Sequence, residues 1–541
     1  MKMIRRVLTC SKSIWLLSLL IFAGCVALPD GAYALTPACP SPTVPEGNAC
    51  VLNSDVVLTP TLILPSHTTL DCKNHTITPT SPGTVGGTTR STPEVALFLN
   101  GAQGVTIQDC KIKGFDHGIL VIRSKVPAAL RHDHEALARM RNRIVRNSIQ
   151  ARFVAINLVT VDNTSVDDNQ ITWYTQGGAG IYVQRDSDIN AITNNVITGD
   201  FALNAAGAFN VPGPALPSNP VVPAGLNGGA ALFVAQCPGG APSVLSAVVN
   251  GTLYQLTISD SLVPTEDFTS DNLVEGNTIS FPAPAVSTGI NLAISQRSTV
   301  RNNTVSKAIA SISLGAQMGP PPAGQRQFPG TCTLDSTRLC LGDVDCNIPV
   351  LDNALSKGTC SLPPPQSITW VTSDAKIEGN TIHGPFQIGV GIGGPGTIVQ
   401  DNTIEGPLTP LGTGGIVLSG KFALETSRIF RNRIANVSNA IQLNKVVQGK
   451  PAAFFGAEFS LNDITVYDTA VRTSADYDLA SELSVDGRGN YWGLTCAQGP
   501  HGFDPHAVQG PGGLVNPAVK DSHAYGEPVT GIITQLPLPC F

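Results

Sequence analysis

The chain has 541 residues, of which 42% are hydrophobic and only 13% are charged. So small a share of charge excludes a disordered acidic or basic polymer and a long solvated coiled coil. Glycine and proline number 54 and 41, so turns are frequent and long helices are scarce. The formal net charge of −6 disfavours nucleic acid as a partner, because nucleic-acid binding needs a basic surface.

Residues 1–34 have the pattern of a secretory signal peptide. A basic head containing Arg5 and Arg6 precedes a short apolar run at 14–28 and a small-residue cleavage site before Leu35. Lipoprotein processing with acylation of Cys25 is the alternative. Since no later stretch is apolar for long enough to span a bilayer, we expect a secreted, periplasmic or cell-surface protein without a transmembrane segment.

A six-residue pattern recurs through most of the chain: an apolar residue, two variable residues, Asn, one variable residue and a second apolar residue. Neighbouring copies are mostly 22 to 30 residues apart. The asparagines of these copies are Asn147, Asn169, Asn195, Asn277, Asn303, Asn380, Asn402, Asn432 and Asn462, and Cys110 takes the Asn position in one further copy.

This spacing predicts an all-β solenoid of parallel strands around a narrow apolar core. Each apolar residue of the pattern belongs to a short strand and points inward. We expect each Asn at a tight corner, where its side chain tolerates left-handed backbone angles. Because stacked strands are about 4.8 Å apart, the Asn amides should form a ladder. A leucine-rich repeat also places Asn at a corner, but its leucine consensus is absent here.

Three further segments carry a family resemblance. They are residues 68–77, residues 105–119 and the Gly-Asn-Tyr-Trp-Gly string at 489–493. Together they resemble coils of the right-handed parallel β-helix superfamily, the pectin-lyase-like fold, including its bacterial periplasmic NosD-like members. The resemblance implies a right-handed parallel β-helix. It does not fix an activity, because this fold hosts lyases, hydrolases, epimerases and proteins that are not enzymes.

Interruptions of the repeat define the expected organisation. The segments are a signal peptide at 1–34, an N-terminal cap at 35–64, the β-helix at 65–495 and a C-terminal tail or cap at 496–541, with insertions at about 124–143, 200–271 and 315–370. The first insertion has helix-forming composition at 128–141, where we expect a short helix. Long insertions in a solenoid lie on one side, often the binding side.

Four cysteines gather in the third insertion, within residues 332–360. They are Cys332, Cys340, Cys346 and Cys360. In an oxidising compartment we expect them to pair among themselves as two disulfides in a projecting loop, with three pairings open. The absence of a Cys-x-x-Cys string from this sequence disfavours structural zinc.

The first candidate site is acidic. Asp162, Asp167 and Asp168 precede Asp186 and Asp188 by about one coil. Stacked carboxylates can act as an acid–base couple or hold Ca²⁺. We therefore take Asp167 and Asp168 as catalytic candidates, and the other three as candidate Ca²⁺ ligands. The alternative is a solvated face of the coil.

Two further candidates lie outside the repeat. Arg131 and His132 belong to the first insertion and could bind a substrate or supply a base, whereas the alternative is an exposed polar helix. The Gly-Phe-Asp-Pro-His string at 502–506 resembles one in mannuronan C5-epimerases, which implies proton-exchange roles for Asp504 and His506. In that family the string lies on a coil in the middle of the β-helix, whereas here it lies in the tail.

Aromatic side chains provide the last candidates, because a flat apolar ring matches the C–H face of a sugar. Trp173 and Tyr174 directly follow a corner of the repeat. They are candidates for an exposed sugar-binding platform, and the alternative is that they cap the core.

These features support two hypotheses. The first is a secreted β-helix that binds, and as an enzyme would cleave or epimerise, an extended acidic polysaccharide; the reaction types are polysaccharide lyase, glycoside hydrolase and C5-epimerase, with Ca²⁺ as a candidate cofactor. The second is a non-catalytic, adhesin-like surface protein whose insertions bind partner proteins or another cell-surface component. A NosD-like periplasmic accessory for metal delivery is a third alternative, which the presence of only 4 methionines disfavours.

Overall fold

The computed structural model describes residues 39–58, 61–80, 95–174, 179–184, 187–199, 269–281, 288–293, 295–317, 373–407, 413–419, 427–444, 457–473 and 490–491, and short strands within 230–257, 330–371 and 481–520. The expected signal peptide and Cys25 lie outside these residues. So do four of the candidate residues, Asp186, Asp504, His506 and Cys346.

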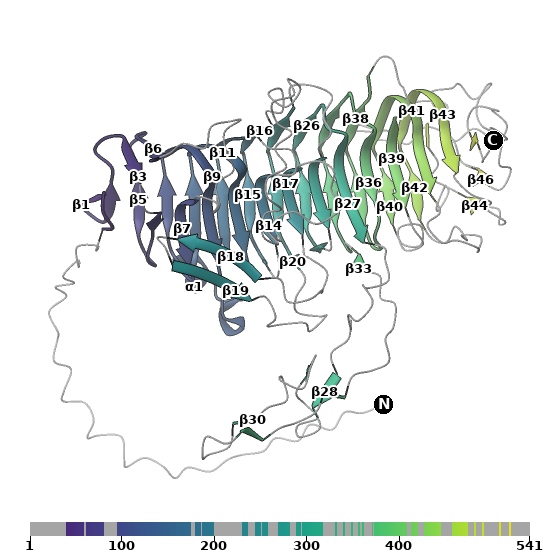
Figure 1. Cartoon of the computed structure of the whole chain (residues 1–541). Helices are drawn as coiled ribbons and strands as arrows, with labels where there is room; N and C mark the ends of the chain where they lie inside the picture. Colours follow the sequence, from purple (N-terminus) through teal and green to yellow (C-terminus); the bar gives the residue numbers. More distant parts are fainter. Residues whose placement is uncertain are drawn as a thin grey trace, which may run out of the picture.

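A 13-stranded sheet, here called sheet A, extends along the solenoid (Figure 1). Its strands in spatial order are β1 (Val44–Glu46), β2 (Ala49–Val51), β5 (Thr69–Asp71), β8 (Thr106–Gln108), β10 (Asn142–Val145), β12 (Thr164–Asp167), β15 (Ala191–Thr193), β21 (Leu273–Glu275), β25 (Thr299–Arg301), β34 (Lys376–Glu378), β37 (Ile398–Gln400), β40 (Arg428–Phe430) and β42 (Glu458–Ser460). Only β1 and β2 pair antiparallel within sheet A; the following strands stack in parallel, one for each coil.

A second parallel set, here called sheet B, closes the coil and has two arms. The first arm contains β3 (Val56–Leu58), β6 (Thr76–Pro79), β13 (Gln170–Trp173), β16 (Val196–Gly199), β22 (Thr278–Ser280), β26 (Thr304–Ser306), β35 (Thr381–His383) and β38 (Thr403–Glu405). The second arm contains β4 (Leu62–Ile63), β7 (Val95–Asn100), β14 (Ala179–Gln184), β17 (Ala230–Ala235), β23 (Thr288–Ala293), β27 (Ala310–Gln317), β36 (Ile388–Ile392), β39 (Gly414–Ser419) and β45 (Val508–Gln509). Four longer strands run through both arms: β9 (Lys111–Ile122), β11 (Ser148–Val159), β41 (Arg433–Asn444) and β43 (Asp463–Thr473).

Smaller elements lie outside the two long sheets. They are the 3₁₀ helix η1 (Ala128–Leu130), the helix α1 (His134–Met140), the pairs β18 (Val244–Val249) with β19 (Thr252–Thr257), β20 (Thr269–Ser270) with β24 (Ser295–Gln296), β30 (Ile348–Pro349) with β31 (Leu355–Ser356) and β44 (Ser481–Glu482) with β46 (Val519–Lys520), the three-stranded sheet of β28 (Gly330–Cys332), β29 (Leu339–Cys340) and β32 (Cys360–Ser361), and β33 (Trp370–Val371), which pairs with β27. The short helix expected within 128–141 is thus present. In the part of the chain that the structure describes, no helix is long and apolar enough to cross a membrane.

The core is a single column of branched apolar side chains. In sheet A the middle residue of each strand points inward, as at Ile107, Ile144 and Val166, which are 0%, 1% and 0% exposed. Strand alternation places their neighbours on the outer face. The predicted all-β parallel β-helix solenoid is therefore confirmed by the strand register of the chain itself.

The predicted ladder of asparagines is also present. Each Asn side chain donates from Nδ2 to Oδ1 of the Asn in the next coil, over 2.8 to 3.0 Å. The column comprises Asn147, Asn169, Asn195, Asn277, Asn303, Asn380, Asn402, Asn432, Asn462 and Asn490. Each Oδ1 also accepts the backbone N–H of the preceding Asn, as in the bond of 3.0 Å from Asn303 N to Asn380 Oδ1.

The prediction that these asparagines themselves take left-handed angles was wrong. The residue just before each Asn has the positive φ, as at Arg146 (56°), Asp168 (53°) and Gly379 (63°). A left-handed residue at this point turns the chain from sheet A toward sheet B and leaves its own side chain on the outside. The Asn that follows is buried at the corner, where its amide meets the amides of neighbouring coils.

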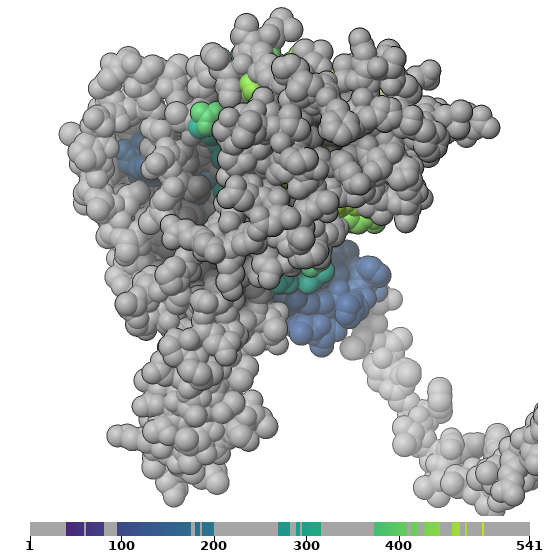
Figure 2. Space-filling model, turned by 90° about the vertical axis from the view of Figure 1, so that its right-hand side faces the viewer, coloured from purple at the N-terminus to yellow at the C-terminus, as the bar shows by residue number. Residues whose placement is uncertain are grey.

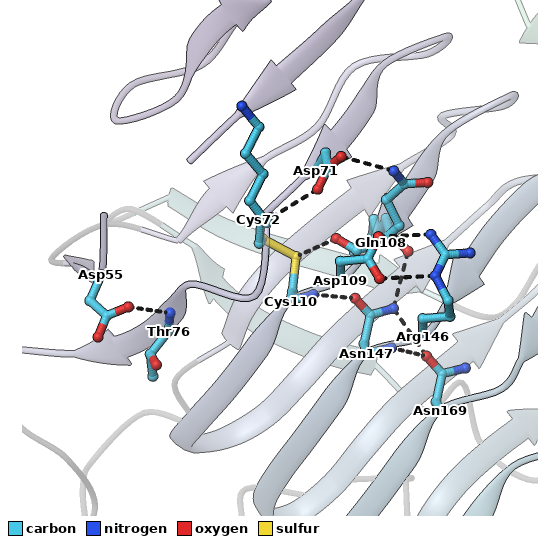
Figure 3. Close-up of a disulfide and its surroundings, with 12 residues drawn as sticks. Asp55, Asp71, Cys72, Thr76, Gln108, Asp109, Cys110, Arg146, Asn147 and Asn169 are labelled. Atoms are coloured by element: carbon cyan, nitrogen blue, oxygen red, sulfur yellow. Dashed lines mark hydrogen bonds and ion pairs between the residues drawn. A yellow bond between two sulfur atoms is a disulfide. The ribbon is translucent and has the colours of Figure 1, made fainter. Parts of the chain in front are cut away.

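Two disulfides lie in the N-terminal part of the described structure. Cys39 bonds Cys50, and Cys72 bonds Cys110. Cys72 and Cys110 occupy consecutive coils at the start of the Asn column, and Cys110 N donates to Asn147 Oδ1 over 3.0 Å (Figure 3). In the first two coils of the column, a covalent bond therefore lies where the later coils have an amide rung.

Candidate functional site

Two irregularities in the pairing of β9 with β11 set apart one place on sheet B. The register runs from Lys113↔Gln150 to Phe115↔Ala151 and then to His117↔Val154. One residue is therefore skipped on β9, and Arg152 and Phe153 on β11 lie opposite the single residue Asp116. Such bulges re-aim side chains and are frequent beside functional sites.

The bulge brings together Asp116, His117, Arg152 and Phe153, here called the polar cluster. Arg152 Nε lies 2.7 Å from Asp116 Oδ1, and the two side chains are 18% and 1% exposed. The guanidinium carbon of Arg152 lies 4.4 Å from the centroid of the Phe153 ring, which itself lies 6.4 Å from the His117 ring. An ion pair, an imidazole and an aromatic ring thus share one small region of the sheet.

His117 is the buried imidazole of the polar cluster. Only 6% of the residue is exposed, and among the residues with described side chains its Nδ1 has no hydrogen-bond partner. Burial lowers the pKa of His117; the charge of Asp116 raises this pKa and the charge of Arg152 lowers it. The imidazole is therefore neutral at pH 7 and can accept a proton.

The polar cluster lies on the outer face of the second arm of sheet B. A Cβ at Gly118 would lie 2.5 Å from Cγ2 of the core residue Ile149, so Gly118 faces the core and the preceding residue, His117, faces outward. In the same arm Leu120, Asn157 and Tyr182 follow one another in register on adjacent strands. Each lies between two core residues and therefore points outward, yet they are only 4%, 1% and 1% exposed. A row of sheltered side chains thus crosses the coils beside the polar cluster.

The acidic candidates Asp167 and Asp168 lie on the outer side of sheet A. Asp167 is half-buried at the end of β12, where its Oδ1 accepts from Thr193 Oγ1 at 2.5 Å and from Asn194 Nδ2 at 3.0 Å. Asp168 is exposed at the left-handed corner that follows. The contacts of Asp167 are therefore made with neutral groups of the next coil rather than with a second carboxylate.

Asp162 and Asp188 are brought together as the spacing predicts, and both are buried. Asp188 N donates to Asp162 Oδ1 over 3.1 Å. Lys125 Nζ lies 2.7 Å from Asp162 Oδ1, and one Arg131 nitrogen lies 3.3 Å from Asp162 Oδ2 and 3.1 Å from Asp188 Oδ2. Burial raises the pKa of Asp162, while the charge of Lys125 lowers it.

This ion cluster concerns the expected Ca²⁺ ligands and the expected role of Arg131. The positive charge beside Asp162 and Asp188 comes from Lys125 and Arg131, which take the place expected for Ca²⁺. In the described ranges no three His, Cys, Asp or Glu side chains are grouped so as to hold a metal. Arg131 links residues 124–143 to the coils, and because its side chain is 37% exposed, its contact with a substrate stays a prediction. The blue part of the chain, which includes this insertion, forms a protrusion on the lower side of Figure 2.

The other sequence candidates divide between surface and core. His132 is exposed between η1 and α1, as expected. Trp173 is 0% exposed and packs edge-on against Phe281 at a centroid distance of 5.9 Å, so it cannot present a ring to a sugar. Alternation along β13 places it on the same inner side as Ile171, which agrees with the alternative of a core cap. Tyr174, the next residue, is half-buried.

Sequence reasoning missed the polar cluster. Asp116 and His117 lie within a string that was interpreted only as coil sequence. The available signal was two consecutive titratable residues between Phe115 and Gly118, directly before the apolar run at 119–122. Arg152 gave no such signal, because the bulge that brings it to Asp116 is a property of strand pairing.

Comparison with known proteins gave structural neighbours only. No family model matches the chain, and no curated protein matches it. A substituted catalytic domain of a GH87 alpha-1,3-glucanase in complex with tetrasaccharides has a TM-score of 0.42 and 11% identity over 77% of this chain and 60% of that domain. The chain thus spans less than two thirds of that domain.

Two further solved structures match a similar share of this chain and a larger share of their own length. The A-module of a mannuronan C-5 epimerase from Azotobacter vinelandii has a TM-score of 0.31 and 10% identity over 80% of this chain and 85% of that module. An exopolygalacturonase from Thermotoga maritima has a TM-score of 0.31 and 8% identity over 78% of this chain and 79% of that protein. The assignment of a parallel β-helix rests on the strand register of this chain.

Proposed function

We propose that this protein binds and processes an extended acidic polysaccharide at the polar cluster, as a lyase or a C5-epimerase, with His117 as the proton-accepting group. The observation that carries the proposal is a buried, neutral imidazole on the outer face of a long parallel sheet, beside an ion pair. Both reactions begin by removing the proton next to a sugar carboxylate, and this step needs a base that is unprotonated near neutral pH.

Arg152 supplies the second requirement, which is stabilisation of the negative charge that develops on the sugar. A guanidinium has five N–H donors, and the contact with Asp116 uses one edge of the group. The remaining donors can bind the carboxylate of a uronate residue, because the Arg152 side chain is 18% exposed. The ion pair with Asp116 then holds the Arg152 guanidinium in one orientation.

The composition of the polar cluster favours these reactions over hydrolysis. Glycoside hydrolysis ordinarily takes two carboxyl groups, one on each side of the scissile bond. Among the described side chains, Asp116 is the single carboxylate of the cluster, and it is committed to Arg152. A base together with a carboxylate-binding cation is the set that proton abstraction needs.

We also propose that the protein acts outside the cytoplasm. Disulfides persist in oxidising compartments, and Cys39–Cys50 and Cys72–Cys110 are both formed. These bonds support the signal-peptide interpretation of residues 1–34. Mass determination of the exported protein separates a chain that begins at Leu35 from one that carries an acylated Cys25.

The test is a screen of uronate polymers, beginning with alginate and pectate. A lyase gives unsaturated sugar ends whose conjugated double bond absorbs in the short-wavelength ultraviolet, and an epimerase incorporates solvent deuterium at C5, which NMR detects. We expect His117→Gln to lower the rate at least ~100-fold. The matched control is His383→Gln on β35, because His383 is an exposed histidine elsewhere on sheet B.

Two results would overturn the proposal. Full activity of His117→Gln would remove His117 from the reaction. Binding of a polymer without any chemical change, by a protein that is folded by circular dichroism, would leave the non-catalytic surface protein as the better description.

A further inference from the structure

We propose that the Cys72–Cys110 disulfide controls the polar cluster: the coil that carries Asp116 and His117 becomes ordered only after this bond has formed. The predicted effect on enzymatic activity rests on the proposed function. The predicted effect on the order of β9 does not, because it is inferred from the contacts between the N-terminal coils. The protein would then be assembled without activity in a reducing compartment and become active after reaching an oxidising one.

The two cysteines occupy the N-terminal end of the Asn column. Asn147 donates to Asn169 Oδ1 over 3.0 Å and to the Ile107 carbonyl over 3.0 Å, as ladder residues do. Cys110 follows in the same column and keeps the backbone contact, since its N–H donates to Asn147 Oδ1. Its side chain has no amide with which to continue the ladder. The bond to Cys72 makes the connection to the preceding coil.

This bond is buried. Cys72 and Cys110 are 0% and 1% exposed and belong to the apolar core. After reduction, two thiols would lie side by side in this place. A thiol is a weak donor and a weak acceptor, so the pair cannot reproduce an amide rung. The two coils would then be held at this corner by backbone contacts and by the exterior hydrogen bond of 3.0 Å from Gln108 Nε2 to Asp71 Oδ2.

The disulfide and the polar cluster are connected through β9. β9 begins at Lys111, the residue directly after Cys110, and the same strand carries Asp116 and His117. On the preceding coil β9 pairs with β6 at Thr76↔Lys111 and Ile77↔Ile112, and with β7 from Val95↔His117 to Asn100↔Ile122. Residues 113–116 lie between these two pairings, and the bulge toward β11 falls in this interval. The disulfide fixes the register of β9 on the N-terminal side of the interval, directly before the pairing with β6.

The redox step needs an oxidant, and a low-molecular-weight disulfide such as oxidised glutathione serves. A thiolate of Cys72 or Cys110 attacks the glutathione disulfide and releases one glutathione; the second cysteine then displaces the other glutathione as the S–S bond closes. Two thiols of the protein are oxidised and one glutathione disulfide is reduced to two thiols. Excess reduced glutathione drives the reverse reaction.

The experiment compares three double variants of the full chain with the wild-type protein. Cys72→Ser with Cys110→Ser removes the bond and offers no amide. Cys72→Asn with Cys110→Asn removes the bond but supplies the side chains that the ladder uses. Cys39→Ser with Cys50→Ser removes the other described disulfide, which lies outside the Asn column, and is the matched control.

Hydrogen exchange of the β9 peptides, read by mass spectrometry, is the primary measurement. In the serine pair we expect exchange at least ~10-fold faster than in the wild type, because the register of β9 is released. We expect the asparagine pair and the Cys39–Cys50 control to stay within about threefold of the wild type. Turnover of the polymer identified in the screen should be lost in the serine pair and kept in the asparagine pair.

Each outcome of these measurements supports or overturns the inference. Wild-type protection of β9 in the serine pair, or equal loss of protection in the serine and asparagine pairs, overturns the inference. If the serine pair does not fold, wild-type protein incubated with increasing reduced glutathione provides the same readout for β9. Absence of turnover in every variant, including the wild type, would refute the proposed function and leave the exchange result standing.

Discussion

Removal of one amide from the middle of the Asn ladder tests the fold at its most repeated contact. Asn380 is 1% exposed, and its Oδ1 accepts from Asn303 N and Asn303 Nδ2, both over 3.0 Å. Its Nδ2 donates to the Val300 carbonyl over 3.0 Å and to Asn402 Oδ1 over 2.9 Å. The substitution Asn380→Ala removes all of these bonds at once.

The energetic cost follows from what remains. Asn303 Nδ2 still donates to the Val274 carbonyl, and Asn402 Oδ1 still accepts Asn380 N. The buried N–H of Asn303 loses the acceptor on Asn380. A buried donor left without an acceptor costs about 1–3 kcal/mol, so we expect Asn380→Ala to lower the free energy of unfolding by that amount.

Urea unfolding followed by far-UV circular dichroism measures the loss, and hydrogen exchange of the β34 peptides localises it. The control is Asn100→Ala, because Asn100 is exposed at the end of β7, and its cost should stay below about 0.5 kcal/mol. Asn380→Asp keeps the shape and the acceptor but turns an oxygen toward the Val300 carbonyl, so it should cost at least as much as Ala. A well-tolerated Asp would refute the role of the amide donor.

Three further predictions concern charge and covalent bonds. Asp162→Ala leaves the cations of the insertion next to one acid and should cost about 3 kcal/mol in urea unfolding, whereas Glu135→Ala, on an exposed pair of α1, should cost less than about 0.5 kcal/mol. Because burial lowers the pKa of His117, the unfolded chain binds its proton more readily; stability should be highest above about pH 6.5 and fall as the pH decreases below it, and His117→Gln should flatten that dependence in denaturation series at several pH values. Cys332 and Cys360 lie opposite each other in β28 and β32, so peptide mass mapping should find disulfides confined to residues 332–360; a bond to any other cysteine would contradict this.

The repeat pattern was sufficient to predict the solenoid, because its physical cause is local. An inward branched residue such as Ile144 and a corner amide such as Asn147 recur with each coil, and both stack on their own copies. The same pattern could not locate the left-handed residue. Arg146 is a variable position of the repeat, and its side chain points outside. There its Nε and one Nη lie 2.9 and 2.7 Å from the carboxylate of Asp109 in the preceding coil, a contact that the repeat pattern does not encode.

The candidate site was harder to predict because its contacts cross between segments. The spacing in the sequence was sufficient to predict that Asp162 lies near Asp188. The cations that neutralise the two carboxylates, however, come from an insertion whose path the repeat does not specify. Likewise, Arg152 meets Asp116 only because β11 bulges. Trp173 was predictable in principle, since it has the same alternation as the buried Ile171.

The Asn ladder also has a direction. Every side-chain amide donates toward the C-terminal coil and accepts from the N-terminal one, so the amide dipoles are aligned along the solenoid, as peptide dipoles are in a helix. Aligned hydrogen-bonded amides polarise one another, so a rung in the middle is stronger than a rung at an end. The solenoid therefore contains an electrically polar column, negative toward Cys110 and positive toward Asn490. A defect at any rung would weaken rungs in coils that it does not touch.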